Sequence, residues 1–138
     1  GFDPGFIDEP MGIALDAEGN VYLADTWNQR MQVFSSLETG FTYLRHWDIT
    51  GWFGTSLQNY PFVAVSPDQH VFVTDPEGYR VLEFTANGEF VRGWGGYSPS
   101  SDGFGLASAV RVDSQGRVWV SDAGNHMLLR FNLPAEIP

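Results

Sequence analysis

Short runs of alternating apolar and small residues recur along the chain. Each run has a valine, a large residue, an aliphatic residue, a small residue and an aspartate, and the runs occupy residues 21–25, 71–75 and 118–122. They begin 50 and then 47 residues apart. A short, largely apolar run bounded by turn residues is consistent with a β-strand, and self-similarity at a period of about 40 to 50 residues is typical of propellers and other repeat architectures.

Each run is the second strand of a longer unit. A short apolar strand precedes it, at residues 13–15, 63–65 and 110–112, and a strand ending in Phe34, Phe84 or Phe131 follows it. A fourth strand is predicted only twice, at 41–49 and 90–94. No longer stretch has the 3.6-residue period of a helix. We therefore predict an all-β fold of three consecutive repeats of antiparallel strands within a single segment, 1–138, with blades at about 11–49, 61–94 and 108–131, the third without its outer strand.

The turns repeat as well as the strands. Gly19 and Gly116 share a position in the first turn of their units, where glycine adopts positive φ without strain, and Gln69 takes that place in the second unit. Asn28, Gly78 and Asn125 share a position in the next turn. These residue types tolerate the left-handed region, so we expect them to adopt it there.

The second strand of each unit has no polar face. Tyr22, Phe72 and Trp119 lie on one face with a small residue two positions later, and aliphatic residues occupy the other face. A sheet with one wet face would show polar residues there. We therefore expect both faces to be covered by neighbouring blades, with these three rings packed between blades.

Composition excludes several classes of function. The formal net charge is -10, and all seven basic residues are arginines, which disfavours nucleic acid and anionic lipid as partners because both require clustered cations. No apolar run approaches the length of a membrane span, so we expect no membrane insertion by this segment. The chain has no cysteine, and therefore no disulfide and no zinc–thiolate site.

The repeat resembles the NHL repeat family of β-propellers. The resemblance rests on residues 10–16, 19–25 and 28–34, on the pair Asn125-His126, and on the outer strand and loop at 88–95, and it covers nearly the whole chain. It implies NHL-type propeller blades. Propellers close with about four to eight blades, so three blades amount to about half of a six-bladed ring. We expect either a homodimer that closes the ring or a head-to-tail polymer.

Charged and imidazole side chains are too scattered to predict a metal centre. Asp25, Asp75 and Asp122 end the three second strands, and either bind a cation on the axis or cap the following turns; identical placement in every unit favours capping. The histidines at 46, 70 and 126 fall on different kinds of element, which argues against a shared metal site. We predict no cofactor.

One end of the predicted blades carries long aromatic loops. The loops at 1–10, 50–60 and 95–107 meet the turns after the second strands at this end, where ligands are expected on a rigid scaffold. The candidate ligand-binding residues are Trp27, Asn28, Trp52, Phe53, Tyr60, Tyr79, Tyr97, Asn125 and His126. The candidate ligands are a peptide, a partner protein or a glycan.

The favoured function is a non-enzymatic binding and assembly module. The alternative is a metal-dependent propeller enzyme, similar to lyases or lactonases, with its site in the central channel; Asp8, Glu9 and Asn59 are the candidate residues near the channel. The sequence does not determine the compartment. An extracellular or periplasmic location is favoured, as a fragment of a longer or processed chain, because the chain begins at Gly1.

Overall fold

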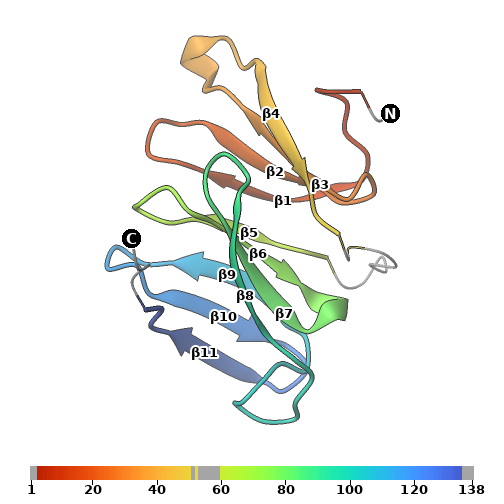
Figure 1. The fold of residues 1–138 in the computed structure, drawn as a ribbon, viewed down its shortest axis with the longest axis vertical. Coiled ribbons are helices and arrows are strands. Elements are labelled where there is room, and N and C mark those ends of the chain that lie inside the picture. Colours follow the sequence, from red (N-terminus) through yellow and green to blue (C-terminus); the bar gives the residue numbers. More distant parts are fainter. Residues whose placement is uncertain (1–2, 51, 53–59, 135–138) are drawn as a thin grey trace.

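Three antiparallel sheets stack face to face in the computed structural model, which describes residues 3–50, 52 and 60–134 (Figure 1). In each sheet the strands lie in chain order. Blade 1 contains β1 (Pro10–Leu15), β2 (Val21–Asp25), β3 (Arg30–Phe34) and β4 (Tyr43–Asp48). Blade 2 contains β5 (Val63–Val65), β6 (Val71–Asp75), β7 (Arg80–Phe84) and β8 (Phe90–Gly95), and blade 3 contains β9 (Ala107–Val112), β10 (Val118–Asp122) and β11 (Met127–Phe131). The predicted all-β class with three consecutive repeats is confirmed.

Helical structure in the described residues is limited to two short 3-10 turns, η1 (Leu37–Thr39) and η2 (Pro76–Gly78). No described helix is long and apolar enough to cross a membrane. The inner strands β1, β5 and β9 contact one another in succession, so the three blades fan out from a common axis.

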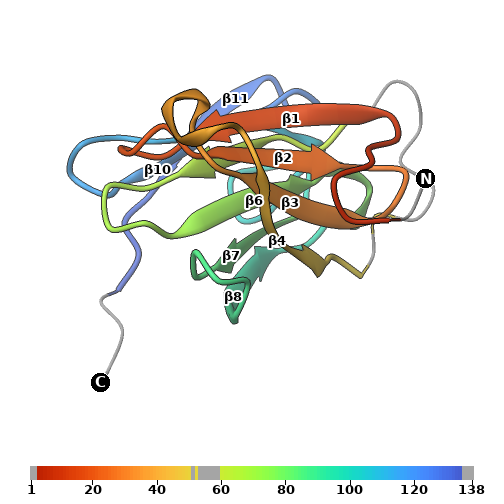
Figure 2. The ribbon, with the colours of Figure 1, turned by 90° about the horizontal axis from the view of Figure 1, so that it is seen from above.

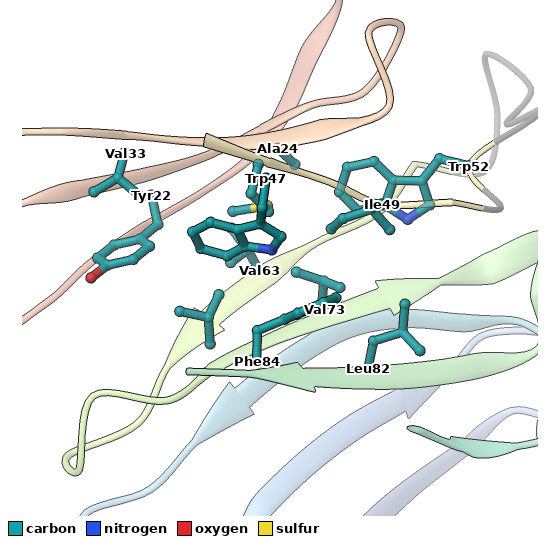
Figure 3. Close-up of a cluster of buried hydrophobic side chains, with 12 residues drawn as sticks. Tyr22, Ala24, Val33, Trp47, Ile49, Trp52, Val63, Val73, Leu82 and Phe84 are labelled. Atoms are coloured by element: carbon teal, nitrogen blue, oxygen red, sulfur yellow. The ribbon is translucent and has the colours of Figure 1, made fainter. Parts of the chain in front are cut away.

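The core lies between blades rather than within them. One cluster joins the large–small face of blade 1 to the aliphatic face of blade 2, where Tyr22, Ala24 and Trp47 meet Val73 and Phe84 (Figure 3). A second cluster joins blade 2 to blade 3 in the same way. Each sheet therefore depends on its neighbour to bury its apolar surface.

The outer strands β4 and β8 each contact the next blade through a tryptophan that packs against a phenylalanine. Trp47 of β4 lies 5.8 Å, centroid to centroid, from Phe84 of blade 2, and Trp94 of β8 lies 5.5 Å from Phe131 of blade 3. Two residues before each tryptophan an arginine donates a hydrogen bond to the following blade. Arg45 Nε reaches the carbonyl of Ala86 at 2.7 Å, and Arg92 Nη1 reaches the carbonyl of Pro134 at 3.1 Å. An Arg-x-Trp sequence on the outer strand thus fastens one blade to the next.

The three large residues of the second strands differ in exposure. Tyr22 and Phe72 are 1% and 3% exposed, as expected for rings between blades. Trp119 is only half-buried, and its indole N–H donates to Asp113 at 3.0 Å. The expectation that Trp119 packs between blades is wrong for a single chain, because no described sheet follows blade 3.

The first turn of each blade has the same left-handed residue. Its φ is 85° at Gly19, 70° at Gln69 and 79° at Gly116. Gln69 therefore adopts a conformation that costs a residue with a Cβ about 1 kcal/mol. Gln69, which stands where the other two blades have glycine, is therefore a strained position in the structure.

We predict that Gln69→Gly raises the free energy of unfolding by about 0.5 to 1 kcal/mol, because relief of strain outweighs the greater flexibility of the unfolded chain. The reverse change in blade 3, Gly116→Ala, is the matched control. A Cβ on Gly116 meets no atom within 4 Å, so this variant should lose about 1 kcal/mol through backbone strain alone. Urea unfolding measures both. A destabilised Gln69→Gly would contradict the assignment.

Candidate functional site

A buried aspartate ends the second strand of every blade at the end that carries the long loops. Asp25, Asp75 and Asp122 are each at most 1% exposed. Figure 2 shows the segment before β1 at the same end as the β2–β3 turn. The carboxylates of Asp25 and Asp122 connect the loop that enters a blade to the turn inside it.

Asp25 binds both the entering loop and the side chains that follow it. Its carboxylate accepts hydrogen bonds from the backbone N–H of Asp8 at 2.8 Å and from the side chains of Asn28, Arg30 and Gln32 at 3.0, 2.7 and 3.0 Å. In blade 2, Arg80 Nε donates to Asp75 at 2.8 Å. Asp25 therefore joins the entering loop to the β2–β3 turn and to β3, whereas Asp75 joins β6 to β7 through Arg80 and makes no side-chain hydrogen bond that caps η2.

Asp122 is held without an arginine. It accepts backbone N–H bonds from Gly105 at 2.9 Å and Leu106 at 2.8 Å, and Asn125 donates through both its backbone and its side chain. Burial acts to raise the pKa of Asp122, but these hydrogen bonds outweigh it and lower the pKa below its usual value. The ionised carboxylate thus anchors the loop before β9.

The left-handed residue of the second turn lies one position later than predicted. Positive φ occurs at Gln29, Tyr79 and His126, with values of 55°, 56° and 56°, and not at Asn28, Gly78 or Asn125. The asparagines are selected instead for their side chains, which donate to Asp25 and Asp122 at 3.0 Å. Gly78 is required because a Cβ there would lie 2.2 Å from Asp75 Oδ2.

The predicted aromatic face is only partly open. Trp27 and Tyr97 are 64% and 68% exposed and His126 is exposed, whereas Tyr60 and Tyr79 are half-buried. Trp52 is 2% exposed and packs in the core between blades 1 and 2 (Figure 3). Its assignment to the ligand face is therefore corrected: the ring fills the gap between two blades. Phe53 and Asn59 lie outside the described residues.

Four of the predicted residues gather where blades 2 and 3 meet. Tyr79 and Tyr97 form an edge-on aromatic pair with centroids 5.3 Å apart. Asn125 donates to the carbonyl of Ser98 at 2.7 Å, which connects the turn bearing His126 to the loop bearing Tyr97. Trp27 lies apart from them on blade 1, where its backbone N–H donates to the carbonyl of Asp8 at 3.3 Å.

A cavity of about 580 Å³ next to this cluster was not predicted from the sequence. Leu82 and Phe90 contribute apolar surface, Arg80 contributes charge, and Gly93 and Gly95 leave the backbone of β8 bare. The signal available in the sequence was the glycine-rich run at 93–96, since glycine inside a strand marks close approach of another group.

The axis of the three blades presents no metal-binding arrangement. A cavity of about 280 Å³ there is lined by aliphatic residues of β1, β5 and β9 and by Arg111. Among the described residues, no three His, Cys, Asp or Glu side chains gather closely enough to hold a metal ion. Asp8 is half-buried, with its N–H bound to Asp25, and Glu9 is exposed with a φ of 46°.

Comparison with known proteins identifies the type of blade. Residues 8–34 match the model of the NHL repeat. The fold is similar to that of a protein from Lactobacillus plantarum (18% identity, TM-score 0.70, covering 91% of this chain and 38% of that one). It is also similar to virginiamycin B lyase from Staphylococcus aureus (13%, 0.61, 91% and 42%) and to a gluconolactonase from Xanthomonas campestris (19%, 0.61, 93% and 39%).

The chain spans about two fifths of the length of these three proteins. No curated protein matches it significantly. At these identities the structural likeness establishes the propeller-blade fold alone, and the matched repeat in blade 1 is consistent with NHL-type blades.

We predict that Asp122→Asn lowers the free energy of unfolding by about 2 kcal/mol at pH 6, because a buried acceptor of several N–H bonds loses its charge. A carboxyl whose pKa is depressed by folding stabilises the protein above its unfolded pKa, about 3.9, and this contribution disappears as the pH falls through the folded pKa. The difference between wild type and variant should therefore shrink below about pH 4.

Urea unfolding between pH 2 and pH 6 measures this difference. Glu38→Gln, an exposed acid in η1, is the matched control and should change stability by less than about 0.5 kcal/mol throughout. A difference at Asp122 that is independent of pH would contradict the anchoring role of the charge.

Proposed function

We propose that this segment of NHL-type propeller is a non-enzymatic assembly and binding module. In this proposal blade 1 of one copy packs against blade 3 of a second copy, and the reciprocal contact closes a six-bladed ring. The two contacts are equivalent, as in an isologous dimer. The ring would then present its aromatic loop face to a peptide, a protein or a glycan.

The observation that carries the proposal is a comparison of equivalent positions in the three blades. Ile13, Val63 and Val110 hold the same register position opposite the second strand. Val63 and Val110 face a preceding blade and are 5% and 2% exposed, whereas Ile13 is 61% exposed. Blade 1 thus presents to solvent a surface that is built to be buried.

The opposite end of the stack repeats this contrast. Met31 and Val81 are both 0% exposed because a blade follows them, whereas Leu128, at the same register position, is 67% exposed. The loops that enter blades 1 and 3 show the same contrast. Phe6 and Phe104 each lie two residues before the backbone N–H that binds the aspartate of their blade. Phe104 is 1% exposed, whereas Phe6 is 60% exposed. Contiguous apolar patches of this kind are rare on soluble monomers.

Assembly is favoured over a lyase- or lactonase-like metal enzyme by what lines the axis. Aliphatic side chains and Arg111 surround the cavity between the inner strands, and an arginine repels a cation. The loop face is favoured for binding by its exposed rings, Trp27 and Tyr97, because exposed aromatic side chains on anchored loops are typical of recognition surfaces.

We predict that light scattering on the purified chain gives twice its mass of 15.3 kDa. Ile13→Asp and Leu128→Asp should each weaken association by at least about 100-fold, because each buries an unpaired carboxylate at both contacts. Both residues are exposed in the single chain, so the variants should fold.

The matched control is Leu37→Asp, which changes an exposed leucine of η1 that lies on neither end face and should leave the dimer intact. A folded, monodisperse wild-type species of one chain's mass would overturn the assembly. A mass that grows with concentration would replace the closed ring by a head-to-tail polymer.

We predict that binding to the loop face is detected by NMR with soluble oligosaccharides as probes. Shift changes should centre on Tyr79, Tyr97 and His126, and Tyr97→Ala should remove them without loss of stability. Leu44→Ala is the control, since Leu44 is 43% exposed on the outer strand of blade 1, away from the cluster where blades 2 and 3 meet. Shift changes confined to the first turns, around Asp16 and Asp113, would place binding at the opposite end and contradict the assignment.

A further inference from the structure

Strand β11 is an edge in a position where the other two blades have a covered strand. β3 pairs with β4 and β7 pairs with β8, whereas β11 has a strand partner on one side only among the described residues. We propose that the free edge of β11 binds an extended peptide of a partner protein as a fourth, antiparallel strand, with an acidic residue opposite Arg130 and a large apolar residue two positions later, opposite Leu128.

The apolar requirement follows from the two outer strands that the chain already has. Trp47 lies opposite Met31 and Trp94 lies opposite Val81 in the antiparallel register. Both tryptophans pack over the neighbouring core rather than pointing into solvent. Leu128 holds the equivalent position on β11 and is 67% exposed, so blade 3 offers its own wall for a large side chain. The second wall, which Phe84 and Phe131 supply from the next blade, has no counterpart after blade 3 among the described residues.

The charge requirement follows from a difference between blades 2 and 3. In blade 2 the residue opposite Arg92 is Glu83, and Arg92 Nε lies 2.9 Å from Glu83 Oε1. In blade 3 the position of Glu83 is occupied by Arg130. An arginine on the added strand would meet a like charge there, so the Arg-x-Trp sequence of the internal outer strands is disfavoured and an acid-x-Trp sequence is favoured.

The surroundings of Arg130 strengthen this preference. Its guanidinium carbon lies 5.8 Å from the centre of the Trp119 ring, and Arg111 is the cross-strand neighbour of Trp119 on its other side. The row across blade 3, from β9 to β11, is therefore Arg111, Trp119 and Arg130, and the free edge lies beyond Arg130. In a chain of net charge -10, this row is a local positive site, and it complements an acidic residue on the incoming strand.

The mode of binding is strand addition, in which main-chain hydrogen bonds supply affinity and alternate side chains supply specificity. It does not rest on the proposed dimer, because β11 already has a strand partner on one side only among the described residues of a single chain. Leu128 belongs to both sites, since the proposed dimer contact covers the end face of blade 3 and the added strand lies along its edge.

The chain supplies its own template for the test. The probe is a synthetic peptide of residues 42–50, which contains the outer strand of blade 1, with Arg45→Glu so that an acid lies opposite Arg130 and Trp47 lies opposite Leu128. Fluorescence anisotropy of the labelled peptide measures its affinity for the whole chain. We expect it to bind about tenfold more tightly than the unchanged peptide, from the exchange of a like-charge pair for an opposite-charge pair.

A charge exchange on the protein makes the test specific. Arg130 is exposed, so Arg130→Glu should fold, and it should reverse the preference in favour of the unchanged peptide. Trp47→Ala in the probe should weaken binding about tenfold or more, and His46→Pro should abolish it because proline interrupts a strand. Hydrogen exchange of the complex should slow at residues 127–131.

Absence of binding at 1 mM probe, equal affinity for the two peptides, or exchange protection at a site other than β11 would overturn the proposal. Light scattering of the same samples reports the dimer separately. A chain that dimerises but does not distinguish the peptides refutes only the edge site, and a monomer that distinguishes them refutes only the assembly.

Discussion

Burial of apolar surface between adjacent sheets is the constraint on which the rest of this structure depends. Each blade is a single sheet with two apolar faces, so it has no core of its own and must use its neighbours. Tyr22 and Phe72 show the result where a neighbour exists, and Trp119 and Leu128 show it where no blade follows among the described residues. The same constraint that holds the three blades together leaves one unsatisfied face at each end of the stack.

Polar interactions have a different and more local role. The aspartates that end the second strands turn their oxygens inward to hold loops, with Asp25 bound to Asp8 and Arg30 and Asp122 bound to Gly105 and Leu106. The carboxylates of Asp25 and Asp122 are thus bound to the protein itself. They do hold the loops that present Trp27 and Tyr97 on a rigid base, which makes exposed rings useful for recognition.

The outer strands combine apolar packing between blades with a polar contact. Arg45 and Trp47, like Arg92 and Trp94, fasten one blade to the next through a hydrogen bond and an aromatic contact. Blade 3 ends at β11 and has no such pair among the described residues. Its edge differs from that of blade 2, because Arg130 holds the position that Glu83 holds there. An outer strand with arginine at this position, as in β4 and β8, is therefore a poor fit, and a strand with an acidic residue is a better one.

The repeat by itself determined the class of fold, the order of strands in each blade and the place of the turns, because alternation and turn residues are local properties that recur in register. It also located the loop end of the blades, since strand order decides which loops share an end. Tertiary structure alone decided which aromatic residues are free. Trp52 and Trp27 are both loop tryptophans in the sequence, yet only Trp52 meets a gap between two blades and is buried. Likewise, Asn28 and Asn125 were selected for bonds to an aspartate rather than for left-handed backbone. Such outcomes depend on contacts between residues distant in sequence, and a local pattern carries no record of those contacts.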